Sequence, residues 1–250
     1  VIYHDNDFEV FIDPNGDTHA YYELEINALG TVWDLFLVKP YRDGGPPIDS
    51  WDIEALRAAV HLNGTLNDPS DRDIGWIVEM AIPWESLAEA AGTPVPPADG
   101  DLWRLNLSRV EWPLEVRDGV YAKAAGSTTG ESVEDNWVWS PQGLVNMHYP
   151  EMWGFVLFSS EPATGASADP APAPAEKAKW LLRRLYYRER GWYRRHGWYT
   201  DNLGALGLET ATPPGHPWPP TISITPSGFE ATLRASDGTL VRITADGRTR

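Results

Sequence analysis

The sequence predicts a mainly β fold, an antiparallel β-sandwich of the jelly-roll or immunoglobulin-like kind, followed by a small α+β C-terminal module. Apolar and polar residues alternate over many short runs, and turn residues separate these runs. Within the first 160 residues only 84–91 has a helical pattern, between Pro83 and Gly92. Many short strands with almost no helix are typical of a sandwich.

Each expected strand has its own alternating run. The first spans 7–13 and ends at turn residues 14–17, and the second spans 21–27. After a turn at 28–30, the later runs cover 31–38, 59–62, 74–82, 103–110, 137–139 and 153–158. Their lengths suit the strands of a small antiparallel domain.

Alternation also assigns the side chains to two faces. The expected core positions are Phe8, Val10, Ile12, Tyr22, Leu24, Ile26, Trp33, Leu35, Leu37, Trp76, Val78 and Met80. The expected opposite face collects Asp7, Glu9, Glu23, Glu25, Asn27, Asp34, Glu79, Arg104, Asn106 and Ser108. This polar face is either exposed to solvent or partnered by another group. Because neighbouring like charges destabilise a sheet, that group would be a cation, an arginine or the hydroxyl groups of a ligand.

Charge divides the chain into two parts. Residues 1–161 carry 28 acidic and 8 basic residues, a net charge of −20, whereas the remainder carries 8 acidic and 12 basic residues. Residues 162–175, rich in Pro and Ala, form the expected linker between a sandwich at 1–161 and a module at 176–250. The total charge of −16 opposes nucleic acid as a partner, and no apolar run is long enough for membrane insertion. With no cysteine, disulfides and thiol catalysis are excluded.

Aromatic residues complement the polar face. The chain has 13 tryptophans, and aromatic residues that we expect in loops or at strand ends are Tyr3, Trp51, Trp112, Trp137 and Tyr149. The C–H face of a pyranose ring packs on an aromatic ring, while its hydroxyl groups need polar partners. These aromatic residues therefore either close the edges of the sandwich or form platforms for a saccharide.

Four segments together resemble a family 9 carbohydrate-binding module. They are His4 to Pro14 (HDNDFEVFIDP), Tyr21 to Asn27 (YYELEIN), Gly75 to Trp84 (GWIVEMAIPW), and the closing stretch from Trp139-Ser-Pro to Trp153-Gly-Phe. The resemblance covers residues 1 to about 160, without the family's first strands. It implies a β-sandwich, non-catalytic saccharide binding between two aromatic platforms, structural calcium, a secreted or cell-surface location (extracellular or periplasmic), and attachment to xylanases or other glycoside hydrolases.

The same resemblance implies which residues contact the saccharide. Tyr3 falls where the family has its first platform, and Glu9 matches a polar contact. The chain departs from the family at Met147, where a Trp is expected, and at Glu23 and Glu25, which replace Gln and Arg. We therefore expect generic saccharide binding and do not carry over the family's specificity for reducing ends. The expected site residues are Tyr3, Glu9, Glu23, Glu25, Asn27, Arg104, Asn106, Met147 and His148.

Calcium has two candidate sites in the sequence. Asp68, Asp71 and Asp73 lie in one loop and offer hard oxygen ligands, although a hydrated turn explains the same pattern. Asp5 and Asp7 form a second candidate. We predict structural calcium at the three-aspartate loop and no other cofactor.

Two other functions remain open. The carboxylates Glu9, Glu23, Glu25 and Glu79 are of the type that glycoside hydrolases use, but a sheet pattern does not give the spacing across a cleft. Haem is the other possibility, held by Met147 or Met152 together with His148 or His4. We assign no catalytic residue.

The C-terminal module is expected to begin with a helix that Pro174 opens and Gly197 ends. Its apolar side chains fall near one face, and eight Lys and Arg residues surround them. A helix of this kind can bind a membrane surface or nucleic acid, or it can pack within its own chain. We expect that it packs within the chain. The predicted strands that follow are 221–225, 229–235 and 239–244, the last two joined by a hairpin at 236–238.

Overall fold

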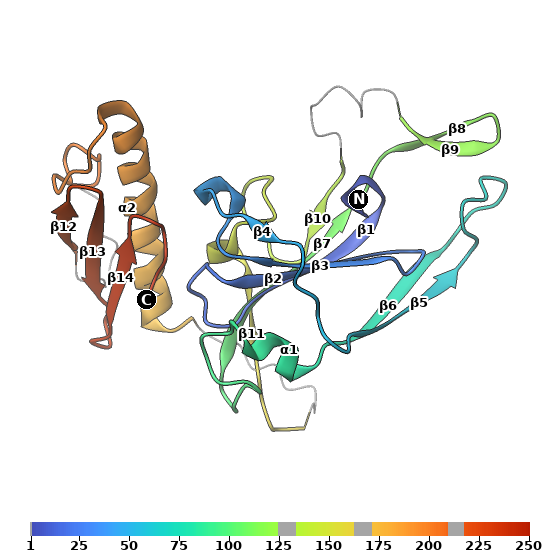
Figure 1. The fold of residues 1–250 in the computed structure, drawn as a ribbon, viewed down its shortest axis with the longest axis horizontal. Coiled ribbons are helices and arrows are strands. Elements are labelled where there is room, and N and C mark those ends of the chain that lie inside the picture. The colour runs from blue at the N-terminus through green and yellow to red at the C-terminus, as the bar shows by residue number, and fades with distance from the viewer. Residues whose placement is uncertain (1, 125–133, 163–171, 210–217) are drawn as a thin grey trace. The chain divides into compact units, whose positions relative to one another are not determined.

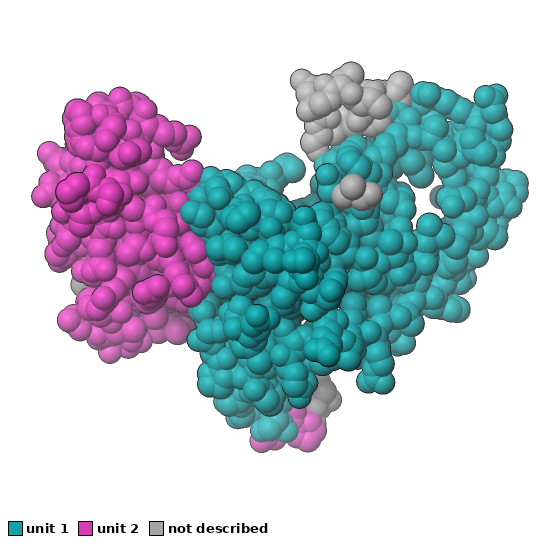
Figure 2. All heavy atoms as spheres, in the orientation of Figure 1, with its two compact units in different colours: residues 1–15, 20–160 teal, residues 16–19, 161–250 magenta. Residues whose placement is uncertain are grey.

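The structure, a computed structural model, describes residues 2–124, 134–162, 172–209 and 218–250. It divides into two compact units, shown in different colours in Figure 2. Unit 1 comprises Val1–Asn15 and Ala20–Ser160, and unit 2 comprises Gly16–His19 and Glu161–Arg250. Most of the expected linker, 163–171, lies outside the described residues.

The chain is mainly β, with antiparallel sheets and few helices, as predicted. The principal sheet of unit 1 has the strand order β10-β7-β1-β2-β3-β4, and β11 also pairs with β7 (Figure 1). Its strands are β1 (Asp7–Asp13), β2 (Tyr21–Asn27), β3 (Val32–Leu37), β4 (Pro47–Ile48), β7 (Leu102–Val110), β10 (Trp137–Val138) and β11 (Gly154–Leu157). Every pairing in this sheet is antiparallel.

Smaller elements complete unit 1. Two separate hairpins are β5 (Arg57–Asn63) with β6 (Gly75–Ala81) and β8 (Leu114–Arg117) with β9 (Val120–Lys123), of which the second was not predicted. The expected helix at 84–91 is shorter, α1 (Trp84–Ala88). Three 3-10 turns are η1 (Ile2–His4), η2 (Tyr41–Asp43) and η3 (Pro150–Met152).

One face of the principal sheet packs on an apolar core as the alternation predicts. This core contains Val10, Ile12, Tyr22, Leu24, Ile53, Leu87 and Trp103. A second apolar cluster lies on the opposite face and contains Phe11, Tyr21, Leu35, Leu37 and Trp153. The opposite face is therefore half apolar and half acidic, because Glu9, Glu23 and Glu25 share it.

The predicted facing of β3 is wrong. Trp33 pairs with Glu25 and Leu35 pairs with Glu23, so these apolar side chains share the face of the carboxylates. Asp34 instead pairs with Leu24, on the face of the first core. Alternation divides the side chains of a strand into two groups, but the preceding turn determines which face of the sheet each group occupies. Here the turn is closed by hydrogen bonds from Asn27 N to Thr31 O and from Gly30 N to Asn27 O.

Glu79 also differs from expectation. It lies on β6, opposite Ala59 of β5, in a two-stranded sheet that is separate from the principal sheet. The sequence pattern gives the alternation of β6 but not the sheet that it joins. Glu79 is therefore not a member of the acidic face.

Unit 2 packs one helix against a three-stranded meander. The elements are α2 (Pro174–His196), β12 (Thr221–Thr225), β13 (Gly228–Arg234) and β14 (Leu240–Thr244), which lie side by side in Figure 1. Leu181, Leu182 and Leu185 of the helix form one core with Phe229 and Ile243 of the strands. The helix ends at Gly197, whose φ of 81° fits a left-handed cap. Among the described helices, none has the length and apolarity to span a lipid bilayer.

Candidate functional site

The candidate site lies on the acidic half of the principal sheet. β1 and β2 are adjacent, and their register sets Glu9 directly opposite Glu25 and Phe11 opposite Glu23. Asp7 lies two residues before Glu9 on the same face. The exposed fractions are 0% for Asp7, 4% for Glu9 and 3% for Glu23 and Glu25. The interpretation of this face as solvated is therefore wrong.

A cavity of about 320 Å³ opens over three of these carboxyl groups, those of Glu9, Glu23 and Glu25. Its lining residues are Tyr3, Glu9, Glu23, Glu25, Trp33, Tyr41 and His148. A neighbouring cavity of about 220 Å³ shares Tyr3, Glu9 and His148 and adds Met147. Six of the nine predicted saccharide residues thus line this pair of cavities: Tyr3, Glu9, Glu23, Glu25, Met147 and His148.

Aromatic rings form another part of the cavity wall. The ring centroids of Tyr3 and Trp33 are 5.9 Å apart, and those of Tyr41 and His148 are 4.5 Å apart. Tyr3 and Tyr41 are 42% and 44% exposed, so both rings can contact a ligand. Sequence reasoning missed Trp33 and Tyr41 as wall residues. The pairing of Trp33 with Glu25 would have revealed the first, whereas no sequence signal marks Tyr41.

The carboxyl groups have strongly perturbed acidities. Burial, opposed by a hydrogen bond with Glu25, raises the pKa of Asp7 to about 7. Burial together with the charge of Asp7 raises the pKa of Glu9 to about 8. Burial and the charges of Glu9 and Asp7 raise the pKa of Glu25 to about 9, and the pKa of Glu23 also lies well above its usual value. These groups can therefore keep protons near neutral pH and can donate as well as accept hydrogen bonds.

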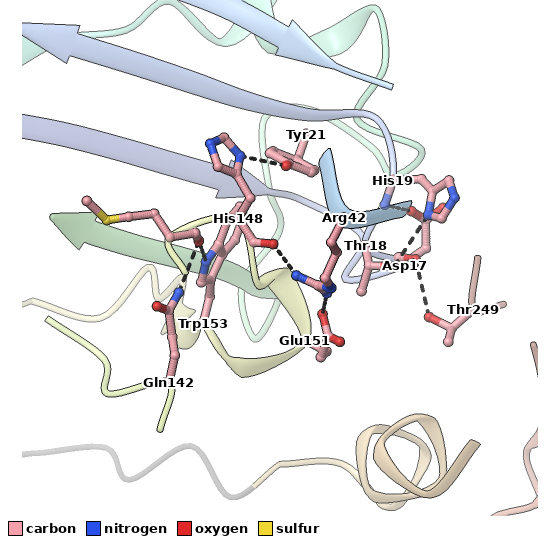
Figure 3. A network of polar contacts seen from close by, with 11 residues as sticks. Asp17, Thr18, His19, Tyr21, Arg42, Gln142, His148, Glu151, Trp153 and Thr249 are labelled. Atoms are coloured by element: carbon pink, nitrogen blue, oxygen red, sulfur yellow. Dashed lines mark hydrogen bonds and ion pairs between the residues drawn. The ribbon is translucent and has the colours of Figure 1, made fainter. Parts of the chain in front are cut away.

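His148 enters the cavity wall from a loop far along the chain. Its Nδ1 lies 2.9 Å from the Tyr21 hydroxyl (Figure 3). Its Nε2 lies 3.7 Å from Glu23 Oε1. Burial, aided by the nearby Arg42 guanidinium, lowers the pKa of His148 to about 3. Burial thus disfavours the charged forms of both His148 and Glu23 and opposes an ion pair between them.

The loop that carries Met147 and His148 is anchored by several polar contacts (Figure 3). Arg42 donates to the backbone carbonyl of His148 and pairs with Glu151 at 2.6 Å. The Met147 carbonyl accepts hydrogen bonds from Trp153 Nε1 at 2.8 Å and Gln142 Nε2 at 3.0 Å. These contacts hold the cavity wall against the sheet.

Three predicted site residues lie outside the cavity lining. Asn27 donates to Asp5 at 3.0 Å and accepts from the backbone of the β2–β3 turn. Arg104 donates to the Trp153 carbonyl at 2.8 Å, and Asn106 accepts from Ser140 N at 2.9 Å. The alternation placed these residues on the correct face, but each supports the backbone around the site instead of lining the cavity.

The three-aspartate loop does not converge on one point. Asp68 accepts from Ser70 N at 2.9 Å, Asp71 accepts from the Thr65 hydroxyl at 3.0 Å, and Asp73 accepts from Thr65 N at 2.6 Å. Hydrogen bonds from Ser70 lower the pKa of Asp68. These carboxylates accept hydrogen bonds within an exposed turn, and calcium at this loop stays a prediction from the sequence. Within the described ranges, the acidic groups that approach closely enough to share an ion are Asp7, Glu9 and Glu25.

The haem candidates have other contacts. The Ser108 hydroxyl lies 2.9 Å from Met147 Sδ, and the His4 ring lies 4.4 Å from the Tyr3 ring.

The resemblance to a family 9 carbohydrate-binding module stays a prediction from the sequence. In comparisons with known proteins, this chain matches no protein-family model, no curated protein and no solved structure.

Proposed function

We propose that unit 1 is a non-catalytic saccharide-binding domain that acts in polysaccharide degradation. The observation that carries this proposal is a single cavity whose wall combines Tyr3, Trp33 and Tyr41 with the carboxyl groups of the sheet. Aromatic rings suit the C–H face of a sugar, and carboxyl groups suit its hydroxyl groups. One cavity thus offers groups for both kinds of contact.

Size and access also favour a small ligand. The larger cavity, of about 320 Å³, is at the lower end of the range for ligand pockets. The second cavity shares three wall residues with it, so the two cavities adjoin. Tyr3 and Tyr41 line this cavity and are both partly exposed, so a ligand from solvent can contact both rings.

The test is calorimetric titration of the full chain with oligosaccharides selected on a glycan array. Tyr3→Ala and Tyr41→Ala should each weaken binding roughly threefold to tenfold, because an aromatic contact contributes ~0.5–1.5 kcal/mol beyond its area. Tyr121→Ala is the matched control, since Tyr121 is 38% exposed but lies on β9, outside both cavities.

Unchanged affinity in both cavity variants would contradict the proposed site. A reducing-sugar release assay on the same samples tests the catalytic alternative. Release that depends on Glu9 or Glu25 would replace saccharide binding by glycoside hydrolysis as the function. Binding without release is the expected result.

A further inference from the structure

Three carboxyl groups of the acidic face converge on one another, and two of them, Glu9 and Glu25, also line the larger cavity. Asp7 and Glu9 of β1 and Glu25 of β2 each offer an oxygen, and these oxygens all lie within 4.8 Å of one another. The three residues are at most 4% exposed. The sheet register explains the convergence, because Glu25 lies opposite Glu9 and Asp7 is the next residue on that face.

These carboxyl groups lack the partners that buried carboxylates usually have. Apart from contacts among the three carboxyl groups themselves, both oxygens of the fully buried Asp7 and one oxygen each of Glu9 and Glu25 have no hydrogen-bond partner. Among the described residues, none of the three forms an ion pair with a basic side chain. Buried charges in proteins are normally paired or coordinate a metal. The unpartnered oxygens can thus take a cation in place of the protons that burial favours.

We propose that Asp7, Glu9 and Glu25 form a binding site for one calcium ion. Calcium takes oxygen ligands at 2.3–2.6 Å, so two ligands on opposite sides of the ion are about 4.6–5.2 Å apart. A limit of 4.8 Å between the oxygens fits this geometry. The group consists of carboxylates only, which favours a hard cation over zinc or copper.

The coordination shell has room for further ligands. Three carboxylates supply three to six oxygens, whereas calcium takes six to eight. Glu9 and Glu25 also line the cavity, so water can complete the shell from that side. The site goes beyond the proposed saccharide binding and does not depend on it.

The test uses the full chain without saccharide, so its result is independent of ligand binding. Differential scanning calorimetry follows the protein in EDTA and then in excess calcium, for the wild type and for the double variant Asp7→Asn with Glu25→Gln. At a calcium concentration a hundredfold above Kd, the melting temperature of wild-type unit 1 should rise by roughly 5–10 °C. The double variant should lose this shift, because amides are much weaker calcium ligands than carboxylates.

A matched control separates this site from the other acidic cluster. The triple variant Asp68→Asn, Asp71→Asn and Asp73→Asn should keep the full calcium shift. A shift that is absent in the wild type, equal in the double variant, or lost only in the triple variant would overturn the proposal.

Direct titration gives a second measurement if the double variant does not fold. Calorimetry of the wild type with calcium should show one ion bound per chain, with release of protons, because the ligands must be ionised. The single variant Glu9→Gln should bind calcium at least tenfold more weakly. Undiminished affinity in Glu9→Gln, or no binding to the wild type, would equally overturn the site.

Discussion

The contact between Arg42 and Glu151 should dominate the stability of the loop that forms the cavity wall. Arg42 Nη2 lies 2.6 Å from Glu151 Oε2, and the two side chains are only 19% and 5% exposed. The guanidinium also donates to the His148 carbonyl and lies 4.3 Å from the centre of the Tyr149 ring. In Arg42→Ala, Glu151 therefore loses a cation in a place that water reaches poorly.

The expected cost follows from this burial. Removing one partner of a buried ion pair destabilises a protein by about 3–5 kcal/mol. For a unit of this size, 1 kcal/mol corresponds to roughly 2–4 °C, so the melting temperature of unit 1 should fall by about 6–20 °C. Differential scanning calorimetry measures this fall directly.

Arg109 provides the matched control. Its Nη2 also lies 2.6 Å from a glutamate oxygen, that of Glu111, and its guanidinium also faces an aromatic ring, that of Trp137. The Arg109 and Glu111 side chains are 46% and 43% exposed, so Arg109→Ala should cost only about 0–1 kcal/mol. Equal losses in Arg42→Ala and Arg109→Ala would refute the argument that burial sets the difference.

The other predictions concern pH and unit 2. In EDTA, Glu9 and Glu25 of the folded chain have pKa values of about 8 and 9. At neutral pH the folded chain therefore keeps protons on these two groups, whereas the unfolded chain has lost them. The free energy of unfolding should therefore fall as pH rises from 7 to 9, by up to ~1.4 kcal/mol per pH unit for each group. Urea unfolding measures this free energy, and a rise with pH would contradict the prediction. Leu185→Ala should destabilise unit 2 by about 2–5 kcal/mol because Leu185 is fully buried, whereas Leu240→Ala, at a position 44% exposed, should change little in the same calorimetric scan. Gly197→Ala should cost about 1 kcal/mol by placing a Cβ in a left-handed cap, and a stability equal to the wild type would contradict that strain.

Local patterns in the sequence determined much of the secondary structure. Alternation with a period of two predicted β1 and β2 and placed Glu9, Glu23 and Glu25 on one face. Pro174 in the first turn and Gly197 after the last turn predicted α2 to within one or two residues. These features depend on neighbours in the chain, because backbone geometry repeats over two residues in a strand and 3.6 in a helix.

Only the tertiary structure decided which elements meet at the site. The turn after Asn27 sets the register of β3 and thereby turns Trp33 toward the carboxyl groups and Asp34 away from them. Contacts between distant segments bring Tyr41 and His148 to one cavity. Burial of the carboxyl groups likewise depends on side chains from several segments, and this burial raises their pKa values. A single sequence carries no local signal for such contacts, since periodicity describes the faces of an element and not its partners.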